Sequence, residues 1–330
     1  MTRWCLVLSA LVLLTCFTVM ADDDDRVMGV YEGGFDDSGA NLALRAQVVG
    51  EGKFQFRAVL FVGQSGQAEE RVEIKGKGKD GVASFNGDSR VNALGGQVAI
   101  SGDIRDQVFK GTMKAGRKTL GFTLRRVFPE PPTRGMTPPD GAIVLYNGGD
   151  PVTNWVRVPE AWCAEEDGSM AVCGSSLMTR QALGSGTYHV EFMTPYMPTE
   201  RYQGRGNSGV YILGRYEIQV LDSFGTPPAW DLCGGIYKQA VPLVDAVLPP
   251  LQWQTYDITF TAPQFDEKGN KTANARITVV HNGKVIHDNL ELTGPTPGGL
   301  GDNEVSEAPL MLQDHGNRVK YRNIWYVPAK

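Results

Sequence analysis

Short runs of alternating hydrophobic and polar residues, separated by glycine-containing turns, extend through most of the chain. In residues 54–57, for example, the order is Phe, Gln, Phe, Arg, and a period of two residues is that of a strand with one buried face. The C-terminal half continues the pattern with no convincing amphipathic helix between the strands. Many strands without alternating helices predict an all-β protein built from antiparallel sheets.

A proline-rich segment, residues 129–139, divides these runs into two groups. Proline at this density does not suit a central strand or a helix interior, so we expect a semi-rigid linker that proteases cut readily. Residues 26–128 are predicted to form a smaller, accessory β-rich domain, in which nothing resembles a catalytic constellation. Residues 140–330 are predicted to form a jelly-roll sandwich.

The composition agrees with two β domains and excludes one class of partner. The chain has 330 residues, with 40 glycines and 19 prolines, which suit many strands joined by tight turns. It carries 32 Lys and Arg residues against 37 Asp and Glu. Because nucleic-acid-binding proteins usually have a basic surplus, we expect no nucleic-acid partner.

The first 21 residues have the pattern of an export signal. Arg3 precedes an apolar run at residues 6–20, and Ala21 ends a small-residue cleavage site. The predicted mature chain begins near Asp22, is periplasmic or extracellular, and contains no membrane span, because no other stretch is long enough. An uncleaved anchor, or a lipoprotein modified at Cys16, is the alternative.

Three cysteines remain after that cleavage. Cys163 and Cys173 flank the turn signal Asp167-Gly168, so they are either cross-strand partners in a disulfide or two buried thiols. The spacing of Cys233 and of the four histidines fits no zinc site. We predict no cofactor; Ca²⁺ bound by scattered acids is conceivable, but no loop has the ligand spacing for it.

Residues 207–225 place polar side chains in a run that otherwise reads as buried strand. If Gly214-Arg215 is a two-residue hairpin loop, Ile212 lies opposite Glu217 and Val210 lies opposite Gln219. Opposed residues share a sheet face. One face then carries Ser208, Val210, Ile212, Glu217, Gln219 and Leu221. The other, core-like face carries Tyr211, Leu213, Tyr216, Ile218 and Val220, with Asn207 and Asp222 at its ends.

The first of these faces is either a sugar-binding surface or an ordinary solvated face. A register error of one residue would change the cross-strand partners of Glu217 and Gln219 but would leave the two side chains on one face.

A second polar group occurs near the C-terminus. Gln313, Asp314 and His315 end one strand, and Arg322 lies in the next. His315, oriented by Asp314 and within reach of Arg322, would make a base. An inter-strand polar network that shapes the turn is the alternative.

Taken together, several stretches of the second domain resemble the 3-keto-disaccharide hydrolase domain family. They are residues 145–155, 206–225, 233–260, 274–296 and 312–325. The resemblance implies a concanavalin-like or laminarinase-like jelly roll that acts on oxidised sugars. It also places at characteristic motif positions the residues Asn207, Ser208, Glu217, Gln219, Asp222, Gln313, His315 and Arg322.

The same residues favour one route of glycoside cleavage. Ordinary glycosidases need two carboxylates at a set spacing, and here Gln219 stands where a second acid would be wanted. A 3-keto sugar has an acidic proton at C2, so one base can start elimination at C1, and water can then add. We expect Glu217 and His315 to act as acid and base, with Arg322, Gln219 and Asn207 stabilising the oxyanion.

These inferences predict an exported protein whose partner is an oligosaccharide or glycoside. Two other classes remain open. One is a non-catalytic carbohydrate-binding module on the same fold. The other is a structural cell-surface protein attached through residues 26–128.

Overall fold

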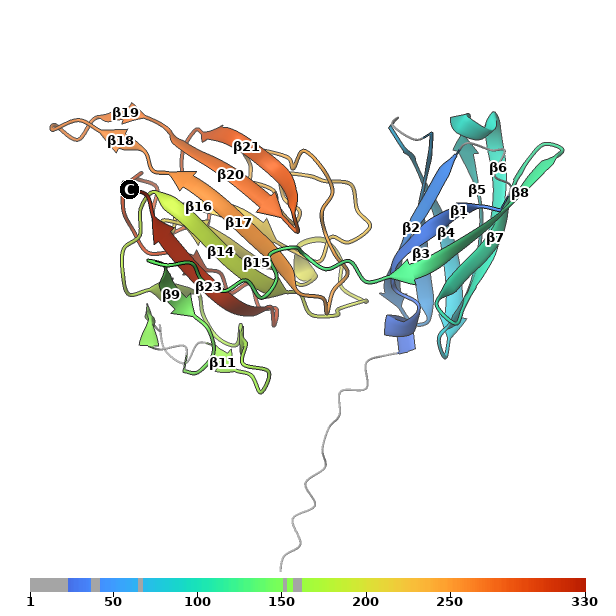
Figure 1. The fold of residues 1–330 in the computed structure, drawn as a ribbon, viewed down its shortest axis with the longest axis horizontal. Coiled ribbons are helices and arrows are strands. Elements are labelled where there is room, and N and C mark those ends of the chain that lie inside the picture. The colour runs from blue at the N-terminus through green and yellow to red at the C-terminus, as the bar shows by residue number, and fades with distance from the viewer. Residues whose placement is uncertain (1–22, 37–41, 65–67, 151–152, 157–161) are drawn as a thin grey trace, which may run out of the picture.

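In the computed structural model, the chain folds into two β structures that Figure 1 shows side by side. The structure describes residues 23–36, 42–64, 68–150, 153–156 and 162–330. The predicted export signal lies outside these residues. Within them, no helix is both long and apolar enough to cross a membrane. The prediction of an all-β protein is confirmed.

The first structure is a closed barrel of eight sequential antiparallel strands. It closes because β1 pairs with both β2 and β8. Alternation turns one face of each strand inward, where Tyr31, Phe56, Phe85, Phe109 and Phe122 fill the interior. The strands are β1 (Gly29–Phe35), β2 (Ala43–Gly52), β3 (Gln55–Gly63), β4 (Glu70–Lys79), β5 (Val82–Val91), β6 (Gly96–Arg105), β7 (Val108–Ala115) and β8 (Lys118–Val127). Two 3₁₀ turns accompany them, η1 (Asp23–Arg26) and η3 (Asn92–Leu94).

The second structure is a sandwich of two antiparallel sheets. The smaller sheet has the order β10 (Trp155–Val156), β13 (Leu177–Thr179), β22 (Met311–Leu312), β15 (Ser208–Ile212) and β16 (Tyr216–Val220). The larger sheet has the order β11 (Cys163–Ala164), β12 (Met170–Ala171), β23 (Lys320–Pro328), β14 (Gly186–Met193), β17 (Gln254–Thr261), β20 (Ala275–His281) and β21 (Lys284–Leu292), with β9 (Ile143–Tyr146) also paired to β23. Outside the two sheets lie the hairpin of β18 (Gln264–Phe265) and β19 (Lys271–Ala273) and the 3₁₀ turn η5 (Tyr202–Gly204). This is the predicted jelly-roll class.

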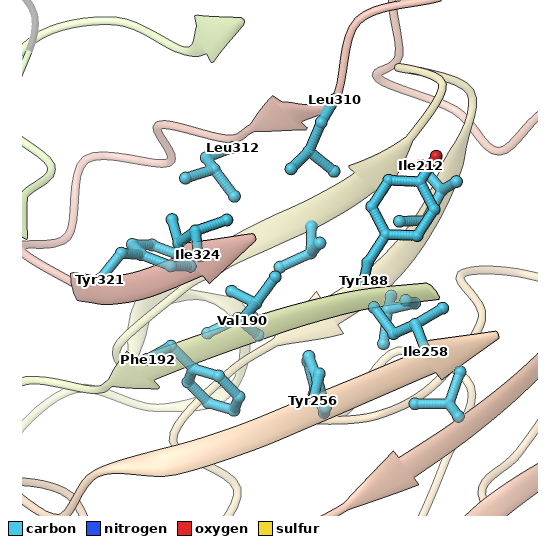
Figure 2. Close-up of a cluster of buried hydrophobic side chains, with 14 of the residues drawn as sticks. Tyr188, Val190, Phe192, Ile212, Tyr256, Ile258, Leu310, Leu312, Tyr321 and Ile324 are labelled. Carbon is cyan, nitrogen blue, oxygen red and sulfur yellow. The ribbon is translucent and has the colours of Figure 1, made fainter. Parts of the chain in front are cut away.

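The core of the sandwich lies between its two sheets. Tyr188, Val190 and Phe192 of β14 project into it from the larger sheet, and Ile212 and Leu312 meet them from the smaller one (Figure 2). Their alternation with polar residues leaves an outer face on each sheet. On β14, for example, His189 and Glu191 face away from this core.

A disulfide joins Cys163 of β11 to Cys173, just beyond β12. The two strands pair, with Cys163 opposite Ala171, so the hairpin at Asp167-Gly168 brings the cysteines together. Of the two states that the sequence left open, the structure has the disulfide. Cys233 is a buried free thiol, and burial raises its pKa to about 11.

The proline-rich segment, which we expected to be a linker open to proteases, is docked on the sandwich by hydrogen bonds. Thr133 Oγ1 donates a hydrogen bond of 2.6 Å to Asp257, and the Gly135 amide donates to Glu191. Asn323 Nδ2 donates to the Met136 carbonyl over 3.0 Å. These partners lie more than 50 residues away in the chain, so proline content alone did not reveal them.

The barrel also contacts the sandwich directly. Arg205 Nη2 donates to the Gly50 carbonyl at 3.2 Å, and Arg57 Nη1 donates to the Gly225 carbonyl at 2.8 Å. Val49 of the barrel belongs to the hydrophobic core of the sandwich. The end of the β2–β3 hairpin therefore supports the loop before β15 and the loop after β16.

Candidate active site

The β15–β16 hairpin has a three-residue loop, one residue longer than predicted. Ile212 pairs with Tyr216, Tyr211 with Glu217, and Gly209 with Gln219. Leu213 and Gly214 both adopt left-handed φ angles, of 53° and 60°, and leucine seldom does so. The predicted register is therefore wrong by one residue, because nothing in the sequence marks Leu213 as a turn residue.

The shifted register changes which residues of β15 accompany Glu217. Gln219 stays on its face, as the period of two requires, while Tyr211 moves onto this face. Val210, Ile212 and Ile218 all belong to the core between the sheets. The face that carries Glu217 and Gln219 is thus the outer face of the smaller sheet. Tyr211 lies on this face, and its predicted place on the core face is corrected.

A cavity of about 200 Å³ opens on this outer face. It brings together five of the residues singled out in the sequence: Asn207, Glu217, Gln219, Gln313 and His315. The rest of its lining consists of residues that were not predicted to belong to the site: Gln203, Tyr211, Tyr237, Pro297 and Gly298. Tyr211 belongs to β15 and Gln203 to η5 just before it, whereas Tyr237, Pro297 and Gly298 come from more distant segments that only the fold places beside these strands.

Glu217 is the carboxylate of this cavity, and it is almost fully buried at 2% exposure. Burial raises the pKa of its carboxyl to about 7, although a hydrogen bond with the Tyr211 hydroxyl opposes the shift. A carboxyl with a pKa near 7 exchanges a proton readily at neutral pH, as a general acid or base must. Its backbone amide is bound to Thr296 Oγ1 at 2.9 Å, which holds the strand at this residue.

Gln203 organises two amides of the cavity. Its Nε2 donates to the Asp231 carbonyl at 2.7 Å. Its Oε1 accepts from Asn207 Nδ2 at 3.0 Å and from Gln219 Nε2 at 3.3 Å. The opposite amide atoms, Asn207 Oδ1 and Gln219 Oε1, are buried and have no partner among the described residues.

Ser208 and Gln313 are linked across β15 and β22. Ser208 projects from the core-side face, where its hydroxyl donates to the Gln313 carbonyl at 2.6 Å and accepts from Tyr321 at 2.8 Å. Gln313 Nε2 donates to the Tyr211 hydroxyl at 3.2 Å. Ser208 therefore lies outside the cavity lining, and it fixes the backbone of Gln313 from the core side of the sheet.

His315 lies at the exposed side of the cavity. Asp314, which we expected to orient it, accepts a hydrogen bond of 2.6 Å from the Gly316 amide and so caps the turn. The structure thus favours the turn-shaping role for Asp314, while His315 remains within the lining.

Asp222 forms a buried ion pair outside the cavity lining. Its carboxylate accepts from Arg205 Nε at 2.6 Å, and the same guanidinium contacts the barrel at Gly50. Burial raises the pKa of Asp222 although Arg205 opposes the shift. In this position Asp222 fixes the loop that precedes β15.

Arg322 does not converge on the cavity, and that prediction is corrected. It lies on β23 of the larger sheet, where its Nε donates to Glu191 at 2.8 Å and its guanidinium stacks 4.0 Å from the centre of the Trp253 ring. Leu312 and Arg322 lie on consecutive strands, but the chain crosses between the sheets from β22 to β23. The two strands therefore do not pair with each other, and Arg322 is out of reach of His315 in the cavity.

Arg322 belongs instead to a buried polar cluster beneath the docked linker. His189 Nδ1 lies 2.6 Å from Asp257 Oδ1, and His189 Nε2 lies 3.5 Å from Glu191 Oε1. Trp325 stacks on the imidazole with ring centroids 5.0 Å apart. Burial disfavours the protonated form of His189, but hydrogen bonds and attraction from the Asp257 and Glu191 carboxylates outweigh it and raise the pKa of His189.

Comparisons with known proteins agree with this architecture. Residues 141–326 match the family model described as a 3-keto-alpha-glucoside-1,2-lyase-like domain. A provisionally assigned glycosyl hydrolase from Parabacteroides distasonis, solved at 2.13 Å, is 33% identical with a TM-score of 0.52, and the match covers 58% of this chain and 85% of that one. A comparison with curated protein sequences gives no significant match.

Two further crystal structures of provisionally assigned glycosyl hydrolases from the same organism are less similar. One is 21% identical with a TM-score of 0.41, over 57% of this chain and 99% of the other. The second is 18% identical with a TM-score of 0.44, over 58% and 95%.

Proposed function

Because the chain belongs to the 3-keto-alpha-glucoside-1,2-lyase-like domain family, we propose that it is an exported enzyme that cleaves 3-keto-glycosides at C1. The observation that carries the proposal is Glu217, a single carboxyl with a pKa of about 7 at a small polar cavity. Gln219 is the neighbouring residue on that face, so the cavity lacks the paired acids of an ordinary glycosidase among its described lining. A reaction that needs one base fits this arrangement.

The carbonyl at C3 of the sugar makes the C2 proton acidic. In the proposed reaction, the Glu217 carboxylate removes that proton, and the electrons of the C–H bond form an enolate on the C3 oxygen. The enolate then collapses, a C1=C2 double bond forms, and the C1–O bond to the aglycone breaks. The products are an unsaturated 3-keto sugar and an alcohol, and addition of water across C1=C2 gives the hydrolysis product.

His315 and Tyr237 take the remaining roles. His315 lies on the exposed side of the cavity, where an aglycone can leave, and it supplies the proton for the departing oxygen. The amide NH₂ groups of Asn207 and Gln219 already donate to Gln203, so we no longer assign the enolate oxygen to them. The Tyr237 hydroxyl on the cavity lining takes that role in the proposal.

The test is release of the aglycone from a panel of 3-keto-glucosides. The Glu217→Gln variant should lose turnover by a factor of about 100 or more while it keeps its affinity for substrate. Glu291→Gln, which changes an exposed carboxylate on β21, is the matched control and should retain full turnover.

The alternative function is a non-catalytic carbohydrate-binding module, which would bind these sugars without releasing any aglycone. Binding without turnover across the whole panel would therefore overturn the proposed enzyme and support the module.

A further inference from the structure

The orientation of the Asn207 and Gln219 amides is determined by backbone carbonyls. The Asp231 carbonyl can only accept, so the Gln203 amide must present its NH₂ group to it. Gln203 Oε1 is then an acceptor toward the cavity residues, and Asn207 and Gln219 must turn their own NH₂ groups to it. The Gln203 carbonyl also accepts from Asn207 Nδ2 at 2.8 Å, so Asn207 is fixed twice.

Gln313 is fixed by an equivalent chain. The Tyr211 hydroxyl has one proton, which it donates to the Pro297 carbonyl at 3.0 Å or to the Glu217 carboxylate. Its oxygen can then only accept from Gln313 Nε2. Gln313 Oε1, like Asn207 Oδ1 and Gln219 Oε1, is left buried without a partner among the described residues.

The three residues that carry these unpartnered acceptors line one cavity, so a ligand in it that offers donors can satisfy them. An unpaired buried polar oxygen is destabilising, so a ligand that supplies O–H or N–H groups recovers that free energy. Asn207 and Gln219 are each at least 98% buried, which makes their amides part of a built site. Within the described lining, no lysine or arginine is present to balance an anion, and the basic side chain that is present, His315, lies at the exposed side. Glu217 adds negative charge above pH 7.

We propose that this cavity selects its sugar by charge: it binds neutral and amino sugars through their O–H or N–H donors and rejects uronic acids and sugar phosphates. An anionic group would add acceptors to a cavity that already presents acceptors, and it would lie near Glu217. The inference rests on the proposed function only in taking the ligand to be a sugar. Gln203 is assigned as the positioning residue that keeps the amide oxygens turned to the ligand.

Three ligands that the reaction cannot consume test this selectivity. They are 3-keto-1,5-anhydroglucitol, which has no leaving group at C1, and its 6-carboxylate and 6-phosphate forms. Calorimetric titration of the full chain at pH 8 should give a dissociation constant about 10-fold or more lower for the neutral ligand than for either anion. Equal or tighter binding of an anion, or no binding of any of the three, would overturn the proposal.

Two variants separate charge selection from a general loss of structure. In Gln203→Leu, the Gln219 amide loses its acceptor and can turn its NH₂ group to the ligand, while Asn207 keeps the backbone carbonyl of residue 203 as its acceptor. The preference for the neutral ligand should therefore shrink. Gln313→Lys, at a half-buried position, adds a cation and should shift the preference toward the 6-carboxylate. A preference unchanged in both variants contradicts the assignment.

The outcome is independent of turnover. If the neutral ligand binds best but no 3-keto-glycoside is cleaved, the proposed reaction fails and the charge selectivity stands. If 3-keto-glucuronides are bound and cleaved as readily as 3-keto-glucosides, the reaction stands and the selectivity fails.

Discussion

Gly209 lies directly against the carboxylate of Glu217: a Cβ atom on Gly209 would stand 2.6 Å from Glu217 Oε1 and 2.9 Å from the Tyr211 ring. The two residues are on adjacent strands, and Gly209 pairs with Gln219. The absence of a side chain at residue 209 is therefore what leaves room for the carboxyl in its present position.

Gly209→Ala should consequently displace the Glu217 carboxyl and lower kcat/KM for a 3-keto-glucoside by about 10- to 100-fold, because small misplacements of a catalytic group are costly. Steady-state kinetics measure the effect. Gly34→Ala in the barrel, where an added Cβ meets nothing within 4 Å, is the control and should leave the rate unchanged. A Gly209→Ala enzyme of normal activity would argue against Glu217 as the base.

The dependence of activity on pH should follow the ionisation of Glu217. The base must be deprotonated, and the pKa of this carboxyl is about 7, so kcat/KM should rise as pH increases through about 7. The measurement is a pH–rate profile with a 3-keto-glucoside. A profile already flat from pH 5 to 8 would show that another group limits the reaction.

The buried carboxyl of Glu217 should also cost stability at high pH. Its pKa is raised from 4.5 to about 7, so the folded state keeps the proton longer than the unfolded state does, and stability falls as pH rises across that interval. Glu217→Gln removes this ionisable group. The change that it makes in the free energy of unfolding should therefore be more stabilising at pH 8 than at pH 4, by about 1–3 kcal/mol. Thermal unfolding at the two pH values tests this, and an equal effect at both would contradict it.

The His189 cluster should stabilise the protein most at acidic to neutral pH. Its pKa is raised above 6.5 by Asp257 and Glu191. The stabilisation is fully present below 6.5 and is lost as pH rises through the folded-state pKa. His189→Gln should lower the free energy of unfolding by about 3 kcal/mol at pH 6 and by less at pH 9. The ion pair between Arg322 and Glu191 does not involve His189 and should remain in the variant.

Thermal unfolding from pH 5 to 9 checks this prediction, with the exposed His315→Gln as control. Because the pKa of Glu191 is lowered to about 2, that carboxylate stays charged across the range. A loss of stability in His189→Gln that grows as pH rises would contradict the prediction.

The docked linker should resist limited proteolysis. Gly135→Pro removes the amide that donates to Glu191, and proline cannot adopt the φ of +71° found there. The variant should be cut between residues 129 and 139 at low protease concentrations that leave the wild-type linker intact, as gel electrophoresis and mass spectrometry of the fragments would show. Cleavage of the wild type at this segment first would mean that the observed contacts do not protect it.

Local pattern was sufficient for several features of this chain. Alternating residues and dense turns indicated an all-β protein, and a period of two placed Glu217 and Gln219 on one face whatever the register. The Asp167-Gly168 turn brought Cys163 and Cys173 into range of each other. Each of these rests on interactions between residues close in the chain, where backbone geometry leaves few choices.

Only the tertiary structure decided the rest. The hairpin register depended on Leu213 adopting a left-handed conformation, which is unfavourable by itself and which the surrounding fold must stabilise. Gln203 reaches the cavity from the 3₁₀ turn η5 and Tyr237 from a loop, and the sequences of both segments carry no periodic signal. Arg322 was wrongly predicted to reach the cavity because consecutive strands can belong to different sheets. The sequence determines which side chains alternate along a strand, whereas the packing of the two sheets determines which of those side chains meet.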